Sequence, residues 1–423
     1  MKNILIITYY WPPSGGSGVQ RWLKFSKYLP ENGWKPIIYT PESPLFNIMD
    51  KDLLNDVHNE VEVWKTPIWE PYSIKNKLFG KSSVDNAGVI QDKSSIKNKL
   101  MNWVRGNIFI PDPKIFWVKP SVKYLNKKIQ EECIDYIVST GPPHSMHLIA
   151  LGLKKMNPKL KWISDFRDPW SEIDLLNEFY LTKKSRLKYK KLEKEVLDNS
   201  DVCLTVSETW VDSFKELGSS NVKLITNGFD EDDFRVLEKE DDSFVIGHFG
   251  LLNHLRNPKN LWKTLNEICE QNSEFNEKLE IRLSGNIDTE VLQSITKYFH
   301  LKGKLKVLGY LSHKEVLNEY NNSSVLLLLL FNSKSGRGNY PGKLFEYLAT
   351  KKFILSFGPK NSDTQRLMSQ KNIGHYFTYS DKNLKEKILD LFNNRNELSN
   401  SENINEFSRA NLTKKLSNLL NSL

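Results

Sequence analysis

The sequence has little cysteine and no long apolar run. Its 423 residues include three scattered cysteines (Cys133, Cys203 and Cys269), which form no C-x-x-C pair. This argues against a disulfide framework and a cysteine-based zinc site, and it favours a reducing compartment. The apolar runs Ile4–Ile7 and Val325–Phe331 are far shorter than the about 20 residues that span a bilayer, so we expect both to be buried strands.

No secretory signal is visible at the start of the chain. Met1-Lys2-Asn3 leads into a short apolar segment that ends at Trp11-Pro12-Pro13. We therefore expect a cytoplasmic protein, either free or peripheral at the inner face of the cell membrane. Hydrophobic residues make up 39% of the chain and aromatic residues 11%, which excludes a disordered chain and fits two or three domains of about 100–200 residues each.

The positive charge is concentrated in one stretch of the sequence. The chain carries a net charge of +9, and residues 73–128 contain twelve Lys or Arg against three Asp, so the remainder is close to neutral. The same stretch contains Trp103, Phe109, Phe116 and Trp117. Basic residues mixed with aromatic ones suit an anionic membrane surface or a phosphate-bearing acceptor, and we favour these over nucleic acid. A solvated surface insertion remains the alternative.

The order of the expected elements indicates an α/β fold. A strand, a glycine turn, a helix and a second strand follow one another at the start, which is typical of a parallel sheet. The same order resumes after a charged, patternless linker at 235–243. The first half has expected strands at Lys2–Thr8, Trp34–Tyr39, Val61–Lys65, Tyr136–Thr140, Trp162–Asp165, Val202–Val206 and Lys223–Thr226. The second half has expected strands at Phe244–Phe249, Leu279–Ser284, Leu305–Leu308, Val325–Leu330, Phe353–Phe357 and Gly374–Phe377.

These patterns predict two Rossmann-like domains whose strand edges face a cleft. We place the first domain at 1–238, with the basic aromatic insertion at about 73–128, and the second at 239–402. Residues 403–423 have a helical apolar pattern. Polar or glycine residues follow most of the strands, and this edge of an open α/β sheet is where ligands bind.

A glycine-rich turn follows the first strand. Gly15 and Gly16 lack a Cβ, so the backbone there can approach an anionic or sugar ligand closely, although a merely tight turn is the alternative. The pattern Gly16-x-Gly18-x-x-Arg21 has arginine where a dinucleotide fingerprint has its third glycine, so a hydride-transfer enzyme is not favoured.

Two further motifs in the first half carry candidate catalytic residues. Gly141-Pro142-Pro143-His144-Ser145 places His144 at a strand end, where a neutral imidazole can accept an acceptor hydroxyl proton or bind a sugar hydroxyl. His147, one turn later, is expected to be structural. The segment after the next strand contains Asp165, Arg167 and Asp168, which are costly to bury unless paired. They either serve a polar cleft, orienting His144 or binding the acceptor, or brace the loop.

The second half contains a predicted phosphate-binding site. Arg256 follows a strand and Gly250, ahead of a helix start at which Lys259 can assist. The strongest motif is Ser335 to Ala349, in which a glycine-rich loop opens a helix at Gly342-Lys343-Leu344. Lys343 places a positive charge beside a diphosphate, and Glu346 can accept hydrogen bonds from both hydroxyls of a ribose. By contrast, Asp230-Glu231-Asp232 follows Asn227-Gly228 in an acidic run, so we expect a solvated loop and no metal.

Taken together and in this order, the motifs resemble bacterial glycosyltransferases of the family-4-like group, which have the GT-B fold. The carriers are Tyr10-Trp11-Pro12-Pro13 with Gly15-Gly16, Gly141-Pro142-Pro143-His144-Ser145, Asp165-Phe166-Arg167-Asp168-Pro169-Trp170, Asn227-Gly228-Phe229-Asp230 and Gly342-Lys343-Leu344-Phe345-Glu346-Tyr347-Leu348. The resemblance implies a donor nucleotide in the second domain, an acceptor in the first, and a final helix that crosses back to the first domain.

The resemblance also implies roles for single residues. Glu346 matches the ribose-binding glutamate and Arg256 a diphosphate-binding base. The implied reaction transfers a sugar from a UDP- or GDP-linked donor, retains anomeric configuration and uses no cofactor and no metal. The basic aromatic stretch, in a chain without a spanning segment, leads us to expect a lipid-linked or polysaccharide acceptor, as in lipopolysaccharide or capsule synthesis.

One position departs from the pattern of the family. The first glutamate of the usual Glu-x7-Glu would fall at position 338, which is Gly338 here. The loop backbone can replace this carboxylate, or donor preference can differ. A sugar-nucleotide epimerase on the same fold and a non-catalytic partner subunit are the alternatives to a transferase.

Overall fold

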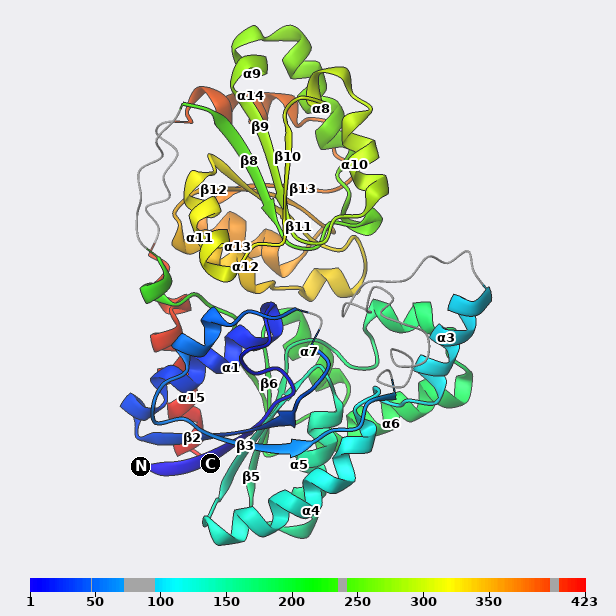
Figure 1. Cartoon of the computed structure of the whole chain (residues 1–423), viewed down its shortest axis with the longest axis vertical. Coiled ribbons are helices and arrows are strands. Elements are labelled where there is room, and N and C mark those ends of the chain that lie inside the picture. The colour runs from blue at the N-terminus through cyan, green and yellow to red at the C-terminus, as the bar shows by residue number, and fades with distance from the viewer. Residues whose placement is uncertain (47, 72–95, 235–241, 396–402) are drawn as a thin grey trace. The chain divides into compact units, whose positions relative to one another are not determined.

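The computed structural model describes residues 1–46, 48–71, 96–234, 242–395 and 403–423 (Figure 1). By their contacts, these residues divide into two compact units: Met1–Thr226 with Arg409–Leu423, and Asn227–Ser408. We refer to them as unit 1 and unit 2. Most of the expected linker at 235–243 and the first part of the basic stretch, 73–95, lie outside the described residues.

Unit 1 is built on a seven-stranded parallel sheet in the order β3-β2-β1-β4-β5-β6-β7. Each strand expected in the first half is present. The strands are β1 (Lys2–Ile7), β2 (Trp34–Glu42), β3 (Glu62–Pro67), β4 (Tyr136–Gly141), β5 (Lys161–Phe166), β6 (Val202–Thr205) and β7 (Val222–Leu224). The helices are α1 (Ser17–Tyr28), α3 (Ile96–Asn107), α4 (Ile115–Glu131), α5 (Ser145–Met156), α6 (Lys183–Asn199), α7 (Glu208–Glu216) and α15 (Arg409–Asn421).

Both faces of the unit 1 sheet are buried, because successive side chains of a strand point to opposite faces. Leu5 and Ile7 of β1 belong to one apolar core, whereas Ile4 and Ile6 belong to a second one. This arrangement explains why the strands read as continuous apolar runs, as is typical of parallel sheets covered by helices on both sides. Figure 1 shows α4 and α5 on one side of this sheet and α1 with α15 on the other.

The C-terminal helix belongs to unit 1, as expected. Leu412, Leu416 and Leu420 of α15 lie in the same core as Trp22 of α1. The indole of Trp34 also donates a hydrogen bond to the hydroxyl of Ser417. The helical pattern of the last residues therefore marks the face that packs against the first unit.

Unit 2 repeats the architecture with a six-stranded parallel sheet in the order β10-β9-β8-β11-β12-β13. Its strands match the expected ones within one residue. They are β8 (Phe244–Phe249), β9 (Leu279–Ser284), β10 (Leu305–Gly309), β11 (Val325–Leu329), β12 (Phe353–Phe357) and β13 (Gly374–Phe377). The helices are α8 (Lys259–Gln271), α9 (Ser273–Lys278), α10 (Thr289–Thr296), α11 (His313–Asn322), α12 (Gly342–Ala349), α13 (Asp363–Lys371) and α14 (Lys385–Asn393).

The chain passes between the units earlier than the expected boundary after residue 238, and it returns at 408/409 rather than 402/403. The reason is that the segment from Asn227 is hydrogen-bonded within unit 2. The amide of Asn227 donates to the carbonyl of Tyr340, and the backbone N–H of Phe229 donates to the carbonyl of Phe407.

Among the described residues, the structure has no helix that is both long enough and apolar enough to cross a membrane.

Candidate functional site

The order of the strands locates a candidate site in each unit. The first strand of each sheet is an interior strand. The strands that follow it in sequence are added first on one side and then on the other, so the strand order reverses between β1 and β4 in unit 1 and between β8 and β11 in unit 2. In open parallel sheets, ligands bind beyond the carboxyl ends of the strands at this point. The loops there carry the candidate residues of the sequence motifs.

Asp165, at the end of β5, is fully buried and fully bonded. Arg21 of α1 donates three hydrogen bonds of 3.0–3.2 Å to the two carboxylate oxygens. The indole of Trp22 and the hydroxyl of Thr140 donate to Oδ2 at 2.7 and 2.9 Å. The side chains of Arg21 and Asp165 are 1% and 0% exposed. Asp165 thus braces the strand ends, and these five bonds occupy its carboxylate.

Arg167 links the loop after β5 to the end of β4 and to the first turn of α1 through backbone carbonyls. Its guanidinium donates to Gly141 at 3.1 Å, to Gly18 at 3.0 Å, and to Pro142. Burial lowers the pKa of Arg167, although Asp165 and Asp168 oppose that shift. Arg21 holds the carboxylate of Asp165, and the hydrogen bonds of Arg167 go to these carbonyls instead.

His144 is the residue immediately before α5 and is 8% exposed. Its ring stacks on the indole of Trp170, with centroids 5.0 Å apart and an interplanar angle of 4°. Burial, then the neighbouring His147 and Arg167, hold the pKa of His144 well below its usual value. These effects favour a neutral imidazole for His144, at the carboxyl edge of β4.

The other candidate residues of unit 1 lie in the loops after β1 and β5. Asp168 is half-buried in the loop after β5. Gly15 is buried, and its N–H donates to the carbonyl of Ile48. Gly16 is exposed and has a φ of 85°, a conformation that favours glycine. Its role as a donor contact stays a prediction, since Gly15 and Gly16 belong to unit 1 and the other predicted donor contacts belong to unit 2.

Lys343 lies at the first turn of α12 and points to the end of β8. Its ammonium donates a 2.8 Å hydrogen bond to the carbonyl of Phe249. Gly250 has a φ of 140°, and a Cβ there would lie 2.5 Å from Nζ of Lys343. Glycine is thus needed at this position for both its backbone angle and the space it leaves. Burial, and then the positive charge of Arg256, lower the pKa of Lys343 to about 7, although Glu346 opposes the shift.

Arg256 ends the short 3₁₀ helix η5 (His254–Arg256) and stacks its guanidinium on the ring of Phe331, 3.7 Å from the centroid. Phe331 follows β11, so the cation lies where the β8 and β11 loops meet. Lys259 is exposed at the first residue of α8. The structure therefore brings Arg256 and Lys343 close enough to influence each other, whereas Lys259 has no described contact with either.

Glu346 lies one turn into α12 and accepts a 2.8 Å hydrogen bond from the hydroxyl of Tyr320, on α11. Gly342 is the first residue of α12. Leu344 contributes no side chain to the site, because it is fully buried in the unit 2 core and its N–H donates to the carbonyl of Pro341. Gly338 is buried in a short 3₁₀ turn.

Several residues of the two sites were not predicted from the sequence. Arg21 and Trp22 hold Asp165, Tyr320 holds Glu346, and Asp112 accepts hydrogen bonds from the N–H and hydroxyl of Ser145 at the start of α5. Arg21 offered one signal, since it takes the place of the third glycine in the dinucleotide pattern. The others lack a local signal.

The acidic run after Asn227 is a turn. The carboxylate of Asp230 accepts a hydrogen bond from the N–H of Asp232 at the start of a short 3₁₀ helix. Within the part of the chain that the structure describes, no group of three His, Cys, Asp or Glu side chains is placed to hold a metal ion.

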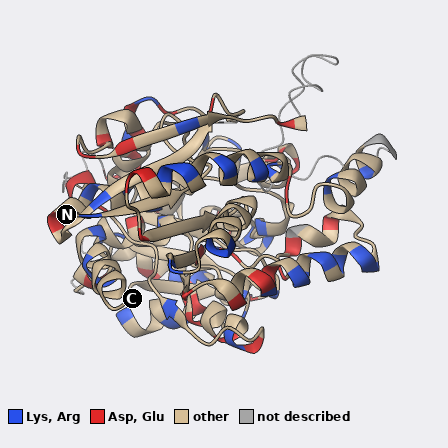
Figure 2. Cartoon of the chain, turned by 90° about the horizontal axis from the view of Figure 1, so that it is seen from below, with Lys and Arg blue, Asp and Glu red and all other residues tan. Residues whose placement is uncertain are grey.

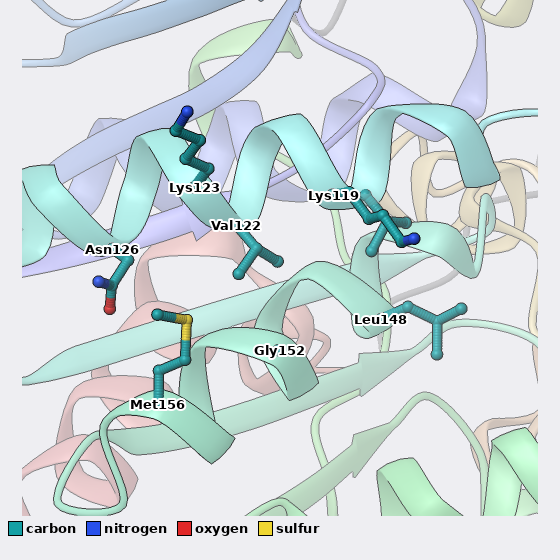
Figure 3. A pocket seen from close by; sticks show the side chains of 8 residues that line it. Lys119, Val122, Lys123, Asn126, Leu148, Gly152 and Met156 are labelled. Carbon is teal, nitrogen blue, oxygen red and sulfur yellow. The ribbon is translucent and has the colours of Figure 1, made fainter.

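A surface groove of about 440 Å³ lies between α4 and α5 of unit 1. Figure 3 shows Val122 of α4 pointing toward Gly152 of α5, where a Cβ would lie 2.7 Å from a Val122 methyl group. Lys119 and Lys123 also line the groove. It lies outside both strand-edge sites.

Comparison with known structures shows the fold. The chain is similar over its full length to a glycosyltransferase from Rickettsia africae, with 14% identity, 98% of that chain covered and a TM-score of 0.64. It is similar to S. aureus TarM, in a mutant complex with Fondaparinux, alpha-GlcNAc-glycerol and UDP, with 12% identity, all of both chains covered and a TM-score of 0.63.

A third similar structure is a UDP-N-acetylglucosamine 2-epimerase from Listeria monocytogenes, itself a provisional assignment. It has 10% identity and a TM-score of 0.58, and the match covers all of this chain and 96% of that one. No protein-family model and no curated protein matches the chain. The fold is thus GT-B, with two Rossmann-like α/β units.

The buried carboxylate gives the first prediction. Replacing Asp165 with Asn leaves the guanidinium of Arg21 buried without its counter-charge, so we expect a loss of about 3–5 kcal/mol in the free energy of unfolding. Urea denaturation measures it. The matched control is Glu62→Gln, because Glu62 pairs with Lys35 at the surface and the two side chains are 44% and 42% exposed. This variant should change the free energy of unfolding by less than about 1 kcal/mol. Equal effects of the two variants would contradict the assignment.

Proposed function

We propose that this protein is a glycosyltransferase that moves a sugar from a nucleoside-diphosphate sugar to a glycan or lipid-linked acceptor. One observation supports it most: Lys343, Arg256 and Glu346 gather at the start of α12, at the reversal point of the unit 2 sheet. Two cations beside a carboxylate match a diphosphate joined to a ribose. The donor is UDP- or GDP-linked.

The electrostatics of unit 2 suit a departing diphosphate. When the sugar–phosphate bond breaks, negative charge develops on the phosphate oxygens. Arg256 and Lys343 supply positive charge that is already in place, and such preorganised electrostatics often provide the largest catalytic contribution. Because the two side chains can neutralise the leaving group, the proposed reaction needs no metal ion. The carboxylate of Glu346, held by Tyr320, binds the ribose hydroxyls.

Unit 1 supplies the proposed acceptor contacts. His144 and Asp168 lie at the carboxyl ends of neighbouring strands, where hydroxyl groups of a glycan can bind. Asp165 and Arg167 act indirectly, since their bonds fix these loops. The complex of TarM with a sugar-bearing glycerol and UDP is consistent with a sugar transfer on this fold. We propose transfer with retention, in which a phosphate oxygen of the leaving group takes the acceptor proton.

A sugar-nucleotide epimerase is the second candidate, because the similar structures include one assigned as a UDP-N-acetylglucosamine 2-epimerase. An epimerase converts its nucleotide sugar without any acceptor. Product analysis after incubation with UDP-N-acetylglucosamine alone separates the two functions, since an epimerised nucleotide sugar supports this candidate.

We propose that unit 1 works at the cytoplasmic face of a membrane in cell-surface glycan synthesis. In the described part of the basic stretch, Leu100, Trp103, Ile108 and Phe116 are 40–62% exposed. Phe116 packs edge-on against Trp69, which is also exposed. Figure 2 shows Lys and Arg interspersed with Asp and Glu along the helices in that view. Aromatic and basic side chains together suit a lipid headgroup region.

Nucleotide binding tests the donor site. In a thermal-shift screen with UDP, GDP, CDP, ADP and NAD, we expect one of the first two to stabilise the protein. Glu346→Ala should weaken its binding about 10- to 100-fold, since hydrogen bonds to a charged group contribute about 1.5–3 kcal/mol. The control is Glu290→Ala, an exposed glutamate on α10. Stabilisation by NAD alone would overturn the proposal.

The pKa of Lys343 predicts pH-dependent binding. In the free protein this pKa lies at about 7, and a bound diphosphate raises it. UDP is fully ionised above about pH 7, so binding at higher pH must take up a proton on Lys343. Affinity should therefore fall up to about tenfold per pH unit from pH 7 to 9.

Titration calorimetry with UDP measures this dependence. Lys343→Met should bind more weakly at pH 7 and show little change with pH. Lys263→Met, on the exposed side of α8, should behave like the wild type. A wild-type affinity that is constant from pH 7 to 9 would contradict the proton uptake.

Vesicle flotation tests the membrane proposal. At low salt, we expect the protein to float with vesicles that contain phosphatidylglycerol and not with pure phosphatidylcholine. Trp103→Ser with Phe116→Ser should reduce the bound fraction several-fold. Phe299→Ser, which removes an 86% exposed aromatic side chain in unit 2, serves as control. Absence of binding at low salt would rule the proposal out.

A further inference from the structure

A chain of buried polar contacts runs behind His144. It begins at Trp162 of β5, whose indole N–H donates a 2.9 Å hydrogen bond to Oγ of Ser139, on β4. The same oxygen lies 2.8 Å from Nδ1 of His147, on α5. All three side chains are 0% exposed. None of these contacts involves a charged group. The positions of the hydroxyl and imidazole hydrogens therefore follow from which atoms can donate and which can accept a hydrogen bond.

The direction of each hydrogen bond can be worked out from one end of this chain of contacts. An indole nitrogen can only donate, so Ser139 Oγ accepts from Trp162 and keeps its own hydrogen for another partner. Nδ1 of His147 is the acceptor within reach, and a buried hydroxyl left without an acceptor is costly. His147 therefore accepts at Nδ1. Burial lowers the pKa of His147 to about 3, so the ring is neutral and carries its hydrogen on Nε2.

Nε2 of His147 lies in the neighbourhood of Nδ1 of His144. A Cβ built on Gly141 would lie 2.6 Å from Nε2 of His147 and 2.9 Å from Nδ1 of His144. The two nitrogens thus converge above the α-carbon of this glycine, which only glycine permits. Both are buried and have no hydrogen-bond partner among the described residues. A hydrogen on Nδ1 of His144 would face the N–H of His147, whereas a lone pair there attracts it.

We propose that Trp162, Ser139 and His147 are positioning residues that hold His144 as the neutral tautomer with its hydrogen on Nε2. His144 then offers a substrate oxygen an N–H donor and not a basic nitrogen. This differs from the expectation that His144 takes the acceptor proton, and it leaves that step to a leaving-phosphate oxygen. Only the identity of the substrate oxygen rests on the proposed function, because the tautomer is a property of the ligand-free chain.

The tautomer can be observed directly. Long-range proton–nitrogen NMR of the full chain labelled with ¹⁵N-histidine, at pH 7, distinguishes the two neutral forms of each ring. His144→Gln and His147→Gln assign the signals by their loss. We expect both residues in the Nε2–H form. An Nδ1–H form of His144 in the wild type would overturn the proposal, even if no variant of Ser139 folds.

Removing the hydroxyl of Ser139 tests whether the contacts from Trp162 through Ser139 to His147, which we call the relay, set the tautomer of His144. In Ser139→Ala, Nδ1 of His147 loses its donor, so we expect His147 and His144 to shift to tautomer mixtures. Ser139→Thr, which keeps the hydroxyl, should restore the wild-type signals. The matched control is Ser164→Ala, because Ser164 pairs with Ser139 in the sheet register and its hydroxyl bonds to Ser200 and Val202. Unchanged tautomers in a folded Ser139→Ala protein would also overturn the proposal.

Enzyme kinetics distinguish a role of Ser139 in positioning His144 for the reaction from a role in stability alone. We expect Ser139→Ala to lower kcat at least tenfold while UDP affinity, a property of unit 2, stays within twofold. Ser139→Thr should recover most of the loss. If the protein transfers no sugar at all, the proposed function fails while the NMR result still decides the relay.

Discussion

The architecture of unit 1 depends on the buried pairing of Asp165 with Arg21. This pair joins α1 to the end of β5, and Arg21 also donates to the carbonyls of Ile225 and Thr226, the last residues before the chain leaves unit 1. Desolvation makes a buried ion pair costly, so its value lies in the further bonds from Trp22 and Thr140, which satisfy the carboxylate. With these strand ends fixed, Arg167 and His144 have defined positions at the same edge.

Unit 2 has the opposite electrostatic arrangement. The charge of Arg256 lowers the pKa of Lys343, whereas that of Glu346, which accepts a hydrogen bond from Tyr320, opposes the shift. Burial and the like charge together lower the pKa of Lys343, so the ligand-free unit carries an unfavourable electrostatic term. A diphosphate would relieve this term. The proposed donor site in unit 2 thus offers cations with which a diphosphate can pair, whereas the carboxylate of Asp165 in unit 1 is already neutralised by Arg21.

The sequence predicted much of the fold because its signals were local. Continuous apolar runs that end in glycine or polar residues identified the strands of both units, and the spacing of Leu412, Leu416 and Leu420 identified the final helix. Partner choice was not predictable, because Arg21 and Asp165 lie 144 residues apart and no local pattern links them. Leu344 illustrates a second limit: its motif suggested a ligand contact, but an apolar residue on the inner face of α12 packs into the core.

The two sites together bear on which residue can act as a base. A general base must accept a proton, and the proposed tautomer of His144, with its hydrogen on Nε2, has its lone pair at the buried Nδ1. Asp165 is saturated by its five hydrogen bonds. In the proposed sugar transfer, two groups remain that can take the proton of the attacking hydroxyl: the carboxylate of Asp168 and the oxygens of the leaving phosphate. A reaction that retains configuration suits the second option, because the leaving group then departs from the face on which the hydroxyl arrives. Through the tautomer of His144, the proposed contacts of Trp162, Ser139 and His147 thus exclude this histidine as the general base, although none of the three needs to contact the substrate.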